Sequence, residues 1–273
     1  MPRIVSLVPS YTEVLCFLGL EANLAGVTEH CDFPETVKNI DKAGTFGRPL
    51  TDRVIALKPD LVMADAAVQG ETAAQLRSAG IEVIAFTPVR VEDIFLVMDE
   101  IAKRCTIEAA ARLLIDALRE RVCRLAGNSS RLKPRVFRLM STDPLMTAGP
   151  GSFQYDALEK AGAKLMAFQT QDPYIKVQPE HVAEFDPEVI LFCGAEKGQA
   201  PRTICVGCAA ERPPCRMTAA DITRDEWLQT TAFRDNRVYP LACHRICRPG
   251  PRLIAGMEKL HSLFFGTGRR LPE

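Results

Sequence analysis

The stretch TIEAAARLLIDALRERVCRLA, residues 106–126, predicts one long amphipathic helix. Its apolar residues recur every three or four positions and so fall on one stripe: Ile107, Ala111, Leu114, Leu118, Val122 and Leu125. Thr106 is placed to cap its start, and Gly127 and Asn128 to end it. At 1.5 Å per residue the helix spans roughly 30 Å, the diameter of a small domain. It can therefore connect two lobes, although a surface helix of one domain would show the same periodicity.

Strands and helices alternate before this stretch. Apolar, β-branched runs predict strands at residues 3–9, 22–27, 61–64 and 81–86. Helical patterns follow at residues 13–20, 52–57, 72–78 and 91–103. This order predicts a small parallel sheet with helices on both faces. Ser10 and Glu13 match a capping box at the first helix, while a ligand contact from that helix start stays open.

The same rhythm restarts after the long helix. Strands are predicted at residues 135–140, 189–192 and 237–241, and helices at residues 153–161 and 179–185. An amphipathic helix closes the chain with Ile254, Met257, Leu260 and Phe264. We therefore expect an α/β fold of two Rossmann-like lobes, residues 1–104 and 131–273, joined by one long rigid helix within residues 105–130. The cleft between two such lobes is where a ligand would bind.

The bulk composition excludes several partners. Lys plus Arg and Asp plus Glu both number 34, so the overall charge favours neither nucleic acid nor an anionic membrane. No run is long enough to insert into a membrane. The opening MPRIVSLVPS enters a strand pattern without a signal peptide, and we expect a cytoplasmic protein, or a periplasmic one whose leader was removed.

Four phrases together resemble one family. They are RIVSLVPSYTEVLCFLGL at residues 3–20, IALKPDLVMAD at 55–65, DPLMTAG at 143–149 and RPGPRLI at 248–254. In this order they resemble the cobalamin-binding branch of the helical-backbone, or class III, substrate-binding proteins. The resemblance implies two lobes bridged by a rigid helix and a cleft ligand such as a corrinoid, heme, siderophore or metal ion. It also implies an ABC permease as partner, with Glu71 similar to the acidic residue used for docking.

A cysteine-rich insert departs from that family. Four thiols close in sequence could hold one zinc ion or an iron–sulfur cluster: Cys193, Cys205, Cys208 and Cys215. Further metal ligands, at this site or a second one, could come from Cys243, Cys247 and, in the other lobe, Cys31. Unligated cysteines or a redox disulfide are the alternatives.

Candidate ligand contacts lie mostly in loops that follow predicted strands. They are Ser10, Tyr11, His30, Phe46, Arg48, Asp143, Gln154, Trp227, His244 and Arg245. A neutral imidazole of His30 or His244 could donate a nitrogen to cobalt, although a lone loop histidine is more often only hydrogen-bonded. The ring of Trp227 could stack on a macrocycle, although ordinary packing is favoured.

Three functions remain open at this point. The leading hypothesis is a non-enzymatic protein that binds cobalamin or another small metal-containing ligand and carries an added cysteine-ligated metal or iron–sulfur site. The alternative is a cytosolic iron–sulfur redox protein or enzyme that reuses the binding fold. The third is a lobe in which zinc serves folding alone.

Overall fold

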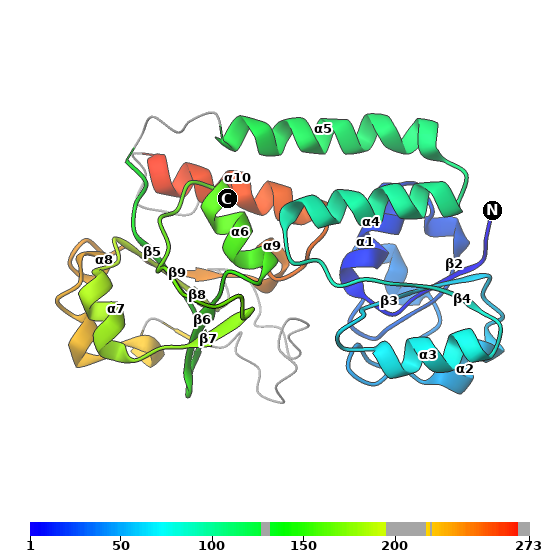
Figure 1. Ribbon diagram of the computed structural model, residues 1–273, viewed down its shortest axis with the longest axis horizontal. Coiled ribbons are helices and arrows are strands. Elements are labelled where there is room, and N and C mark those ends of the chain that lie inside the picture. Colours follow the sequence, from blue (N-terminus) through cyan, green and yellow to red (C-terminus); the bar gives the residue numbers. More distant parts are fainter. Residues whose placement is uncertain (127–131, 195–216, 219, 267–273) are drawn as a thin grey trace. The chain divides into compact units, whose positions relative to one another are not determined.

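The computed structural model describes residues 1–126, 132–194, 217–218 and 220–266. The chain divides into two compact units, one of Met1–Pro88 with Glu92–Arg119 and one of Val89–Val91 with Glu120–Glu273. Helix α5, Glu108–Ala126, therefore begins in the first unit and ends in the second (Figure 1). Gly127 and Asn128, expected to end this helix, lie outside the described residues. Among the helices described, none has the length and apolar character that a membrane crossing requires.

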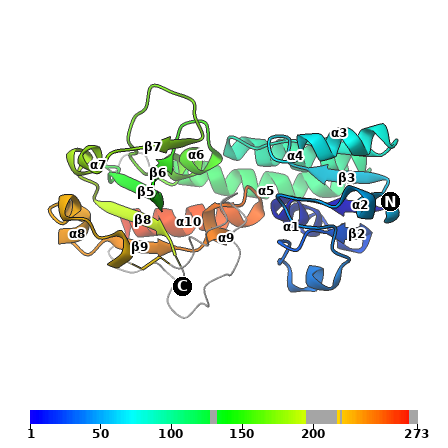
Figure 2. The ribbon, with the colours of Figure 1, turned by 90° about the horizontal axis from the view of Figure 1, so that it is seen from below.

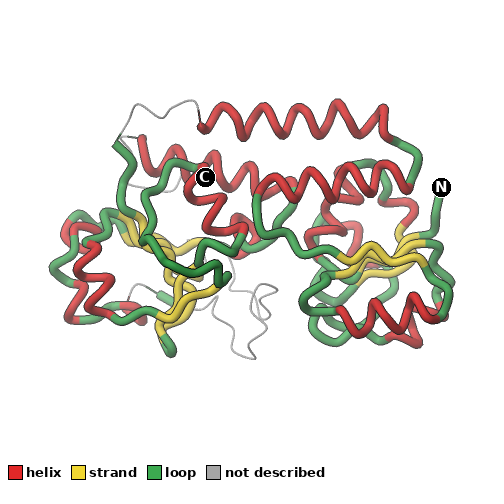
Figure 3. Tube along the Cα trace, viewed as in Figure 1, coloured by secondary structure: helices red, strands yellow, loops and turns green. Residues whose placement is uncertain are grey.

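The first unit is built on a parallel four-stranded sheet. Its order is β2 (Leu24–Val27), β1 (Ile4–Ser6), β3 (Leu61–Ala64) and β4 (Glu82–Ala85). Helices α1 (Pro9–Phe17) and α4 (Val91–Arg104) cover one face, and α2 (Thr51–Ala56) and α3 (Gly70–Ser78) cover the other (Figures 1 and 3). Val5, Val62 and Leu76 are fully buried between these layers. The parallel sheet with two covered faces is the arrangement that the alternating pattern predicts.

The predicted capping box at the first helix is wrong. Helix α1 begins at Pro9, its N-cap is Val8, and no side chain caps it. Proline suits the first helical position because its fixed φ is already helical and its missing N–H would have no partner there. Ser10 therefore lies inside the helix, and Ser10 and Glu13 are both buried.

The predicted capping role of Thr106 is wrong as well. Thr106 has a φ of +55° and precedes α5, which begins at Glu108. Its N–H donates to Lys103 O at 3.3 Å, and the N–H of Ile107 donates to Ala102 O at 2.9 Å. This pair of bonds is a Schellman motif, so Thr106 ends α4 rather than starting α5.

The second unit has a mixed five-stranded sheet. Its order is β7 (Tyr174–Lys176), β6 (Leu145–Ala148), β5 (Val136–Thr142), β8 (Val189–Cys193) and β9 (Val238–Leu241). Strands β5, β8 and β9 are parallel, whereas β6 runs antiparallel to both neighbours. The sequence analysis predicted neither β6 nor β7, because each is short and the Asp-Pro and Gly-Pro-Gly segments around β6 resemble turns.

Helices lie on both sides of this second sheet (Figures 1 and 2). One side carries α6 (Phe153–Lys160) and α10 (Pro251–Phe265), and the other carries α7 (Pro179–Phe185) and α8 (Thr231–Arg234). The residues after β9 form the short helix α9, Cys243–Ile246. The core beside α7 is centred on Trp227, whose ring meets that of Phe137 edge-on at 5.8 Å between centroids.

Candidate functional site

Polar loops gather at the carboxyl ends of the parallel strands in the first unit. Ligands of parallel α/β sheets usually bind outside this edge. Here it is formed by the segments that follow β1, β2, β3 and β4 together with the loop at residues 44–50. We call these segments the first carboxyl edge.

Gln69 connects three segments of the first carboxyl edge. Its side chain is 1% exposed. The amide Nε2 donates to Leu7 O at 3.0 Å and to Phe46 O at 2.7 Å, and Oε1 accepts from the N–H of Asp65 at 2.9 Å. These bonds join the end of β1, the loop at residues 44–50 and the end of β3. Gln69 therefore positions the loop that carries Phe46 and Arg48.

Asp65 orders the turn between β3 and Gln69. Its Oδ1 accepts from the N–H groups of Ala67 and Val68 and from the hydroxyl of Thr87, each at 2.9 Å. Thr87 follows β4, so one carboxylate oxygen links the ends of two neighbouring strands. The loops of this edge are thus held in place by side chains.

His30 and Phe46 lie together at this edge, as two of the predicted contacts. The N–H of Phe46 donates to Nδ1 of His30 at 3.1 Å. An Nδ1 atom that accepts a bond carries no proton, so the neutral imidazole carries its proton on Nε2. Metal binding through Nε2 requires the other tautomer, with the proton on Nδ1. In this conformation His30 accepts a hydrogen bond from the loop that carries Phe46. Its role as a metal ligand stays a prediction.

The other predicted contacts of the first unit differ in exposure. Ser10 and Tyr11 are buried, and the hydroxyl of Tyr11 donates to Phe86 O at 2.5 Å. Burial, reinforced by Asp65 and Asp93, raises the pKa of Tyr11 far above its usual range, so its phenol stays protonated. Arg48 is exposed at the tip of its loop. Arg48 is therefore well placed for solvent or a ligand, whereas Tyr11 serves the interior of the unit.

Cys31 is enclosed by hydroxyl groups of the first unit. It is 1% exposed, and its sulfur lies 3.1 Å from Thr12 Oγ1 and 3.3 Å from Thr28 Oγ1. These contacts tie the segment after β2 to the first turns of α1. They give Cys31 a structural environment within its own unit.

In the second sheet, a buried arginine lies next to the carboxyl end of β8. Arg138, in the middle of β5, is 1% exposed. Its Nη1 donates to Leu191 O at 3.4 Å, and its Nη2 lies 3.0 Å from Cys193 Sγ and 3.8 Å from Cys247 Sγ. The sequence analysis identified neither Arg138 nor Gln69. A charged residue inside the apolar run of residues 136–140 was the available signal for Arg138, whereas Gln69 has no such signal.

The remaining predicted contacts are spread over the second unit. Asp143 is exposed after β5, and His244 and Arg245 are half-buried on α9. Gln154 is buried near the start of α6. Trp227 is 0% exposed, and its indole N–H donates to Pro179 O at 3.3 Å. A ring without an exposed face cannot stack on a ligand, so we correct the assignment of Trp227 to a packing residue.

The predicted cysteine-ligated metal site is not tested by the described residues. Among them no group of three or more His, Cys, Asp and Glu side chains is placed to hold a metal ion. Cys205, Cys208 and Cys215 lie outside the described part of the chain, and the side chain of Cys243 is not described. A zinc or iron–sulfur site at these cysteines stays a prediction.

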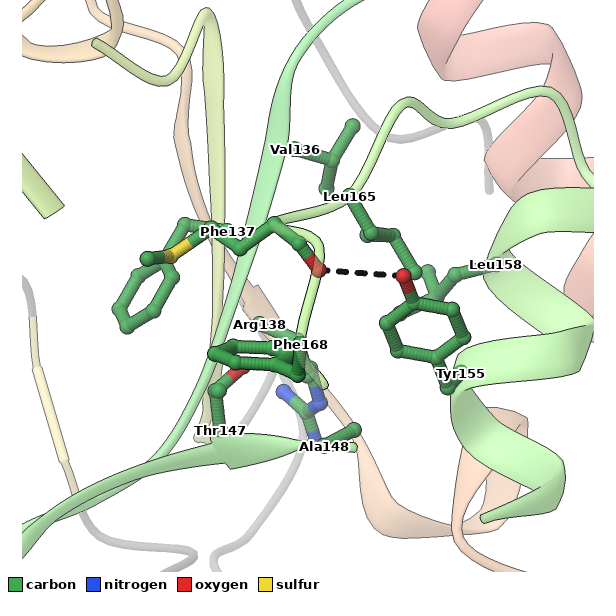
Figure 4. Close-up of a pocket in the computed structure, with 10 residues that line it drawn as sticks. Val136, Phe137, Arg138, Thr147, Ala148, Tyr155, Leu158, Leu165 and Phe168 are labelled. Atoms are coloured by element: carbon green, nitrogen blue, oxygen red, sulfur yellow. Dashed lines mark hydrogen bonds between the residues drawn. The ribbon is translucent and has the colours of Figure 1, made fainter. Parts of the chain in front are cut away.

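A small pocket lies between β5, β6 and α6 (Figure 4). The aromatic rings of Tyr155 and Phe168 and the side chain of Arg138 border it, and the hydroxyl of Tyr155 donates to Met166 O at 3.1 Å. Its volume of about 10 Å³ corresponds to one water molecule. The pocket is therefore too small for a macrocyclic ligand.

Two glycines let backbone segments touch beside β6. A Cβ atom at Gly149 would overlap the carbonyl oxygen of Asp172, and one at Gly151 would overlap that of Gln171. The N–H of Gly149 also donates to Pro173 O at 2.9 Å. The segment before α6 is thus packed directly against the segment before β7.

The sequence of the chain matches a family of binding proteins and several of its relatives. A family described as "Periplasmic binding protein" matches residues 4–242. An uncharacterized ABC transporter substrate-binding lipoprotein, YvrC of Bacillus subtilis, is 27% identical over 94% of this chain and 78% of its own. A vitamin B12-binding protein of Salmonella typhimurium is 30% identical over 71% of this chain and 73% of its own.

Solved structures share the fold. The periplasmic vitamin B12 binding protein BtuF of Vibrio cholerae superposes with a TM-score of 0.77 at 20% identity, covering 96% of both chains. The periplasmic heme binding protein HutB of Vibrio cholerae gives a TM-score of 0.79 at 19% identity over 96% of this chain and 98% of its own. At such identities the likeness shows a common two-lobed α/β fold.

Proposed function

The chain belongs to the periplasmic binding protein family, and on that premise we propose that it binds a metal-containing macrocycle of the cobalamin or heme class for an ABC permease. The observation that carries the proposal is the sequence match to vitamin B12-binding proteins over 71% of the chain. Vitamin B12-binding and heme-binding proteins among the relatives and the structural neighbours support this ligand class. They also support the periplasmic alternative over the cytoplasmic one.

The first carboxyl edge supplies ligand contacts suited to such a macrocycle. The half-buried ring of Phe46 offers an apolar surface, and the exposed guanidinium of Arg48 offers charged donors for the amide, phosphate or carboxylate groups around the ring. Gln69 holds this loop in place. His30 contributes through hydrogen bonding because its Nδ1 accepts from Phe46. Asp143, His244 and Arg245 are the contacts proposed for the second unit.

The test is a calorimetric titration of the purified protein with cyanocobalamin and, separately, with hemin. We expect saturable one-to-one binding of one of them. Arg48→Ala should weaken that binding about tenfold, which corresponds to about 1.4 kcal/mol. The matched control is Arg53→Ala, an exposed arginine on α2, which should leave the affinity unchanged. Absence of saturation with both ligands would contradict the proposal.

The absorption spectrum of the complex tests the role of His30. We expect His30→Ala to leave the visible bands of bound hemin or cobalamin in place, because the hydrogen bond from Phe46 to Nδ1 favours the tautomer with its proton on Nε2. A shift of those bands in the variant would assign a metal–histidine bond instead.

A further inference from the structure

Two cysteines share one buried arginine in the second unit. Cys193 ends β8 and is 1% exposed, whereas Cys247 follows α9 and is half-buried. Nη2 of Arg138 lies 3.0 Å from the first sulfur and 3.8 Å from the second. Since one nitrogen contacts both, the sulfurs can be no farther apart than these two distances combined.

The arginine holds the two sulfurs close to each other. Its guanidinium is planar and rigid, and a single nitrogen of it contacts both sulfurs. Nη1 donates to Leu191 O at 3.4 Å, which fixes the guanidinium against β8.

The two cysteines come from different segments of the second unit. Cys193 is the last residue of β8, and Cys247 directly follows α9. One guanidinium nitrogen contacts both sulfurs. We propose that Cys193 and Cys247 form an oxidisable dithiol that closes to a disulfide, with Arg138 as the residue that positions the sulfurs.

The oxidant in this proposal is a low-molecular-weight disulfide. The thiolate of the more accessible Cys247 attacks one of its sulfurs, which forms a mixed disulfide and releases one thiolate. The thiolate of Cys193 then attacks the Cys247 sulfur of the mixed disulfide and displaces the second thiolate. Two protons pass from the protein thiols to the released thiolates, so that one external disulfide becomes two thiols.

Closure would change the carboxyl edge of the second sheet. Cys193 marks the end of β8, and Cys247 lies four residues before α10 begins at Pro251. A disulfide would fix the end of the strand to the segment that leads into the helix. This inference does not depend on the proposed ligand, because it concerns only the chemistry of the pair.

The experiment exposes the reduced full chain to oxidised glutathione and maps its disulfides. Aliquots are alkylated, digested without reductant and analysed by mass spectrometry. We expect a Cys193–Cys247 linked peptide and the loss of two free thiols per chain. A dominant link between any other pair, or retention of both thiols, would overturn the proposal.

Three variants sharpen this test. Cys247→Ser should abolish the link, whereas Cys105→Ser, which changes a buried cysteine of the first unit, should leave it unchanged. Arg138→Gln shortens the side chain that contacts both sulfurs. It should slow closure about tenfold because the sulfurs lose the donor that positions them, whereas Arg138→Lys, which keeps a long donor, should restore most of the rate. An unchanged rate in Arg138→Gln would remove Arg138 from the proposal.

Discussion

The two units secure the carboxyl ends of their central strands with side chains of different charge. In the first unit the neutral amide of Gln69 donates to two carbonyl oxygens and accepts from one N–H group. In the second unit the cation of Arg138 contacts a carbonyl oxygen and two sulfurs. We call Gln69 the neutral hub and Arg138 the charged hub. A neutral hub needs only matching donors and acceptors, whereas a buried cation also needs polarisable or anionic neighbours. The first edge is therefore held by backbone partners, whereas the second also depends on two sulfur atoms.

Removal of the charged hub should have the largest effect. We expect Arg138→Ala to lower the free energy of unfolding by about 3 kcal/mol, because it leaves a cavity and strips polar neighbours of a buried partner. Urea denaturation measures this. Arg135→Ala, at a partly exposed arginine just before β5, is the control and should cost less than about 1 kcal/mol. Equal losses of unfolding free energy in the two variants would show that the burial of Arg138 does not add to the cost of removing its side chain.

Removal of the neutral hub, Gln69, should have the second-largest effect on the free energy of unfolding. Gln69→Leu keeps much of the side-chain volume but leaves Leu7 O, Phe46 O and the N–H of Asp65 without this partner. We expect a loss of about 2 kcal/mol in the same denaturation experiment. Gln75→Leu on the exposed face of α3 should cost less than about 0.5 kcal/mol. A loss at Gln69 larger than that at Arg138 would reverse the ranking of the two hubs.

The end of α4, in the first unit, allows a stabilising change. Thr106 adopts a left-handed conformation at +55°, which a β-branched residue tolerates poorly. We expect Thr106→Gly to raise the free energy of unfolding by about 0.5 kcal/mol, with relief of strain partly offset by the flexibility of glycine. Thermal unfolding followed by circular dichroism would detect the higher midpoint. A lower midpoint would mean that the threonine side chain stabilises the folded state by more than its left-handed backbone conformation destabilises it.

The end of α5, in the second unit, should show a similarly small effect. Arg121 donates to both carboxylate oxygens of Glu258 on α10, at 2.8 and 2.6 Å. Both groups are about one-third exposed, so we expect Arg121→Ala to cost only about 0.5 kcal/mol near neutral pH.

The stability that the Arg121–Glu258 ion pair contributes should also decrease as the pH falls. The hydrogen bonds from Arg121 lower the pKa of Glu258. Glu258 therefore adds stability above its unfolded pKa, and this contribution disappears as the pH falls through its lowered folded value. The difference between wild type and Arg121→Ala should shrink in acid. A difference that grows as the pH falls would contradict the assignment of this pair.

Regular elements could be predicted from the sequence better than hubs and caps. Strand β3 and helix α7 have the bounds that the apolar pattern and the prolines predicted. Hydrophobic periodicity reports which face is buried, and that information is local. The caps failed for a local reason too, because Pro9 and Thr106 each satisfied a different rule from the one applied.

The hubs could not be predicted because their partners are distant in sequence. Gln69 bonds to Leu7, 62 residues away, and Arg138 reaches Cys247 across 109 residues. A single sequence does not show which backbone carbonyl a glutamine will meet. The sequence did predict that ligand contacts lie in loops that follow strands, and two residues from such loops, His30 and Phe46, are hydrogen-bonded to each other.

The close backbone packing at Gly149 and Gly151 has a practical consequence for protein engineering. A library that seeks new ligand specificity needs positions where side chains can be enlarged without moving the main chain. Gly47 and Gly70, near the first carboxyl edge, have open space around them, whereas any side chain at Gly149 or Gly151 would push against the carbonyl groups of Asp172 and Gln171. Randomisation should therefore be concentrated around Gly47 in the loop at residues 44–50, with Gly44 kept because a Cβ atom there would meet Arg48 O at 2.7 Å, and the turn before α6 should be left as it is.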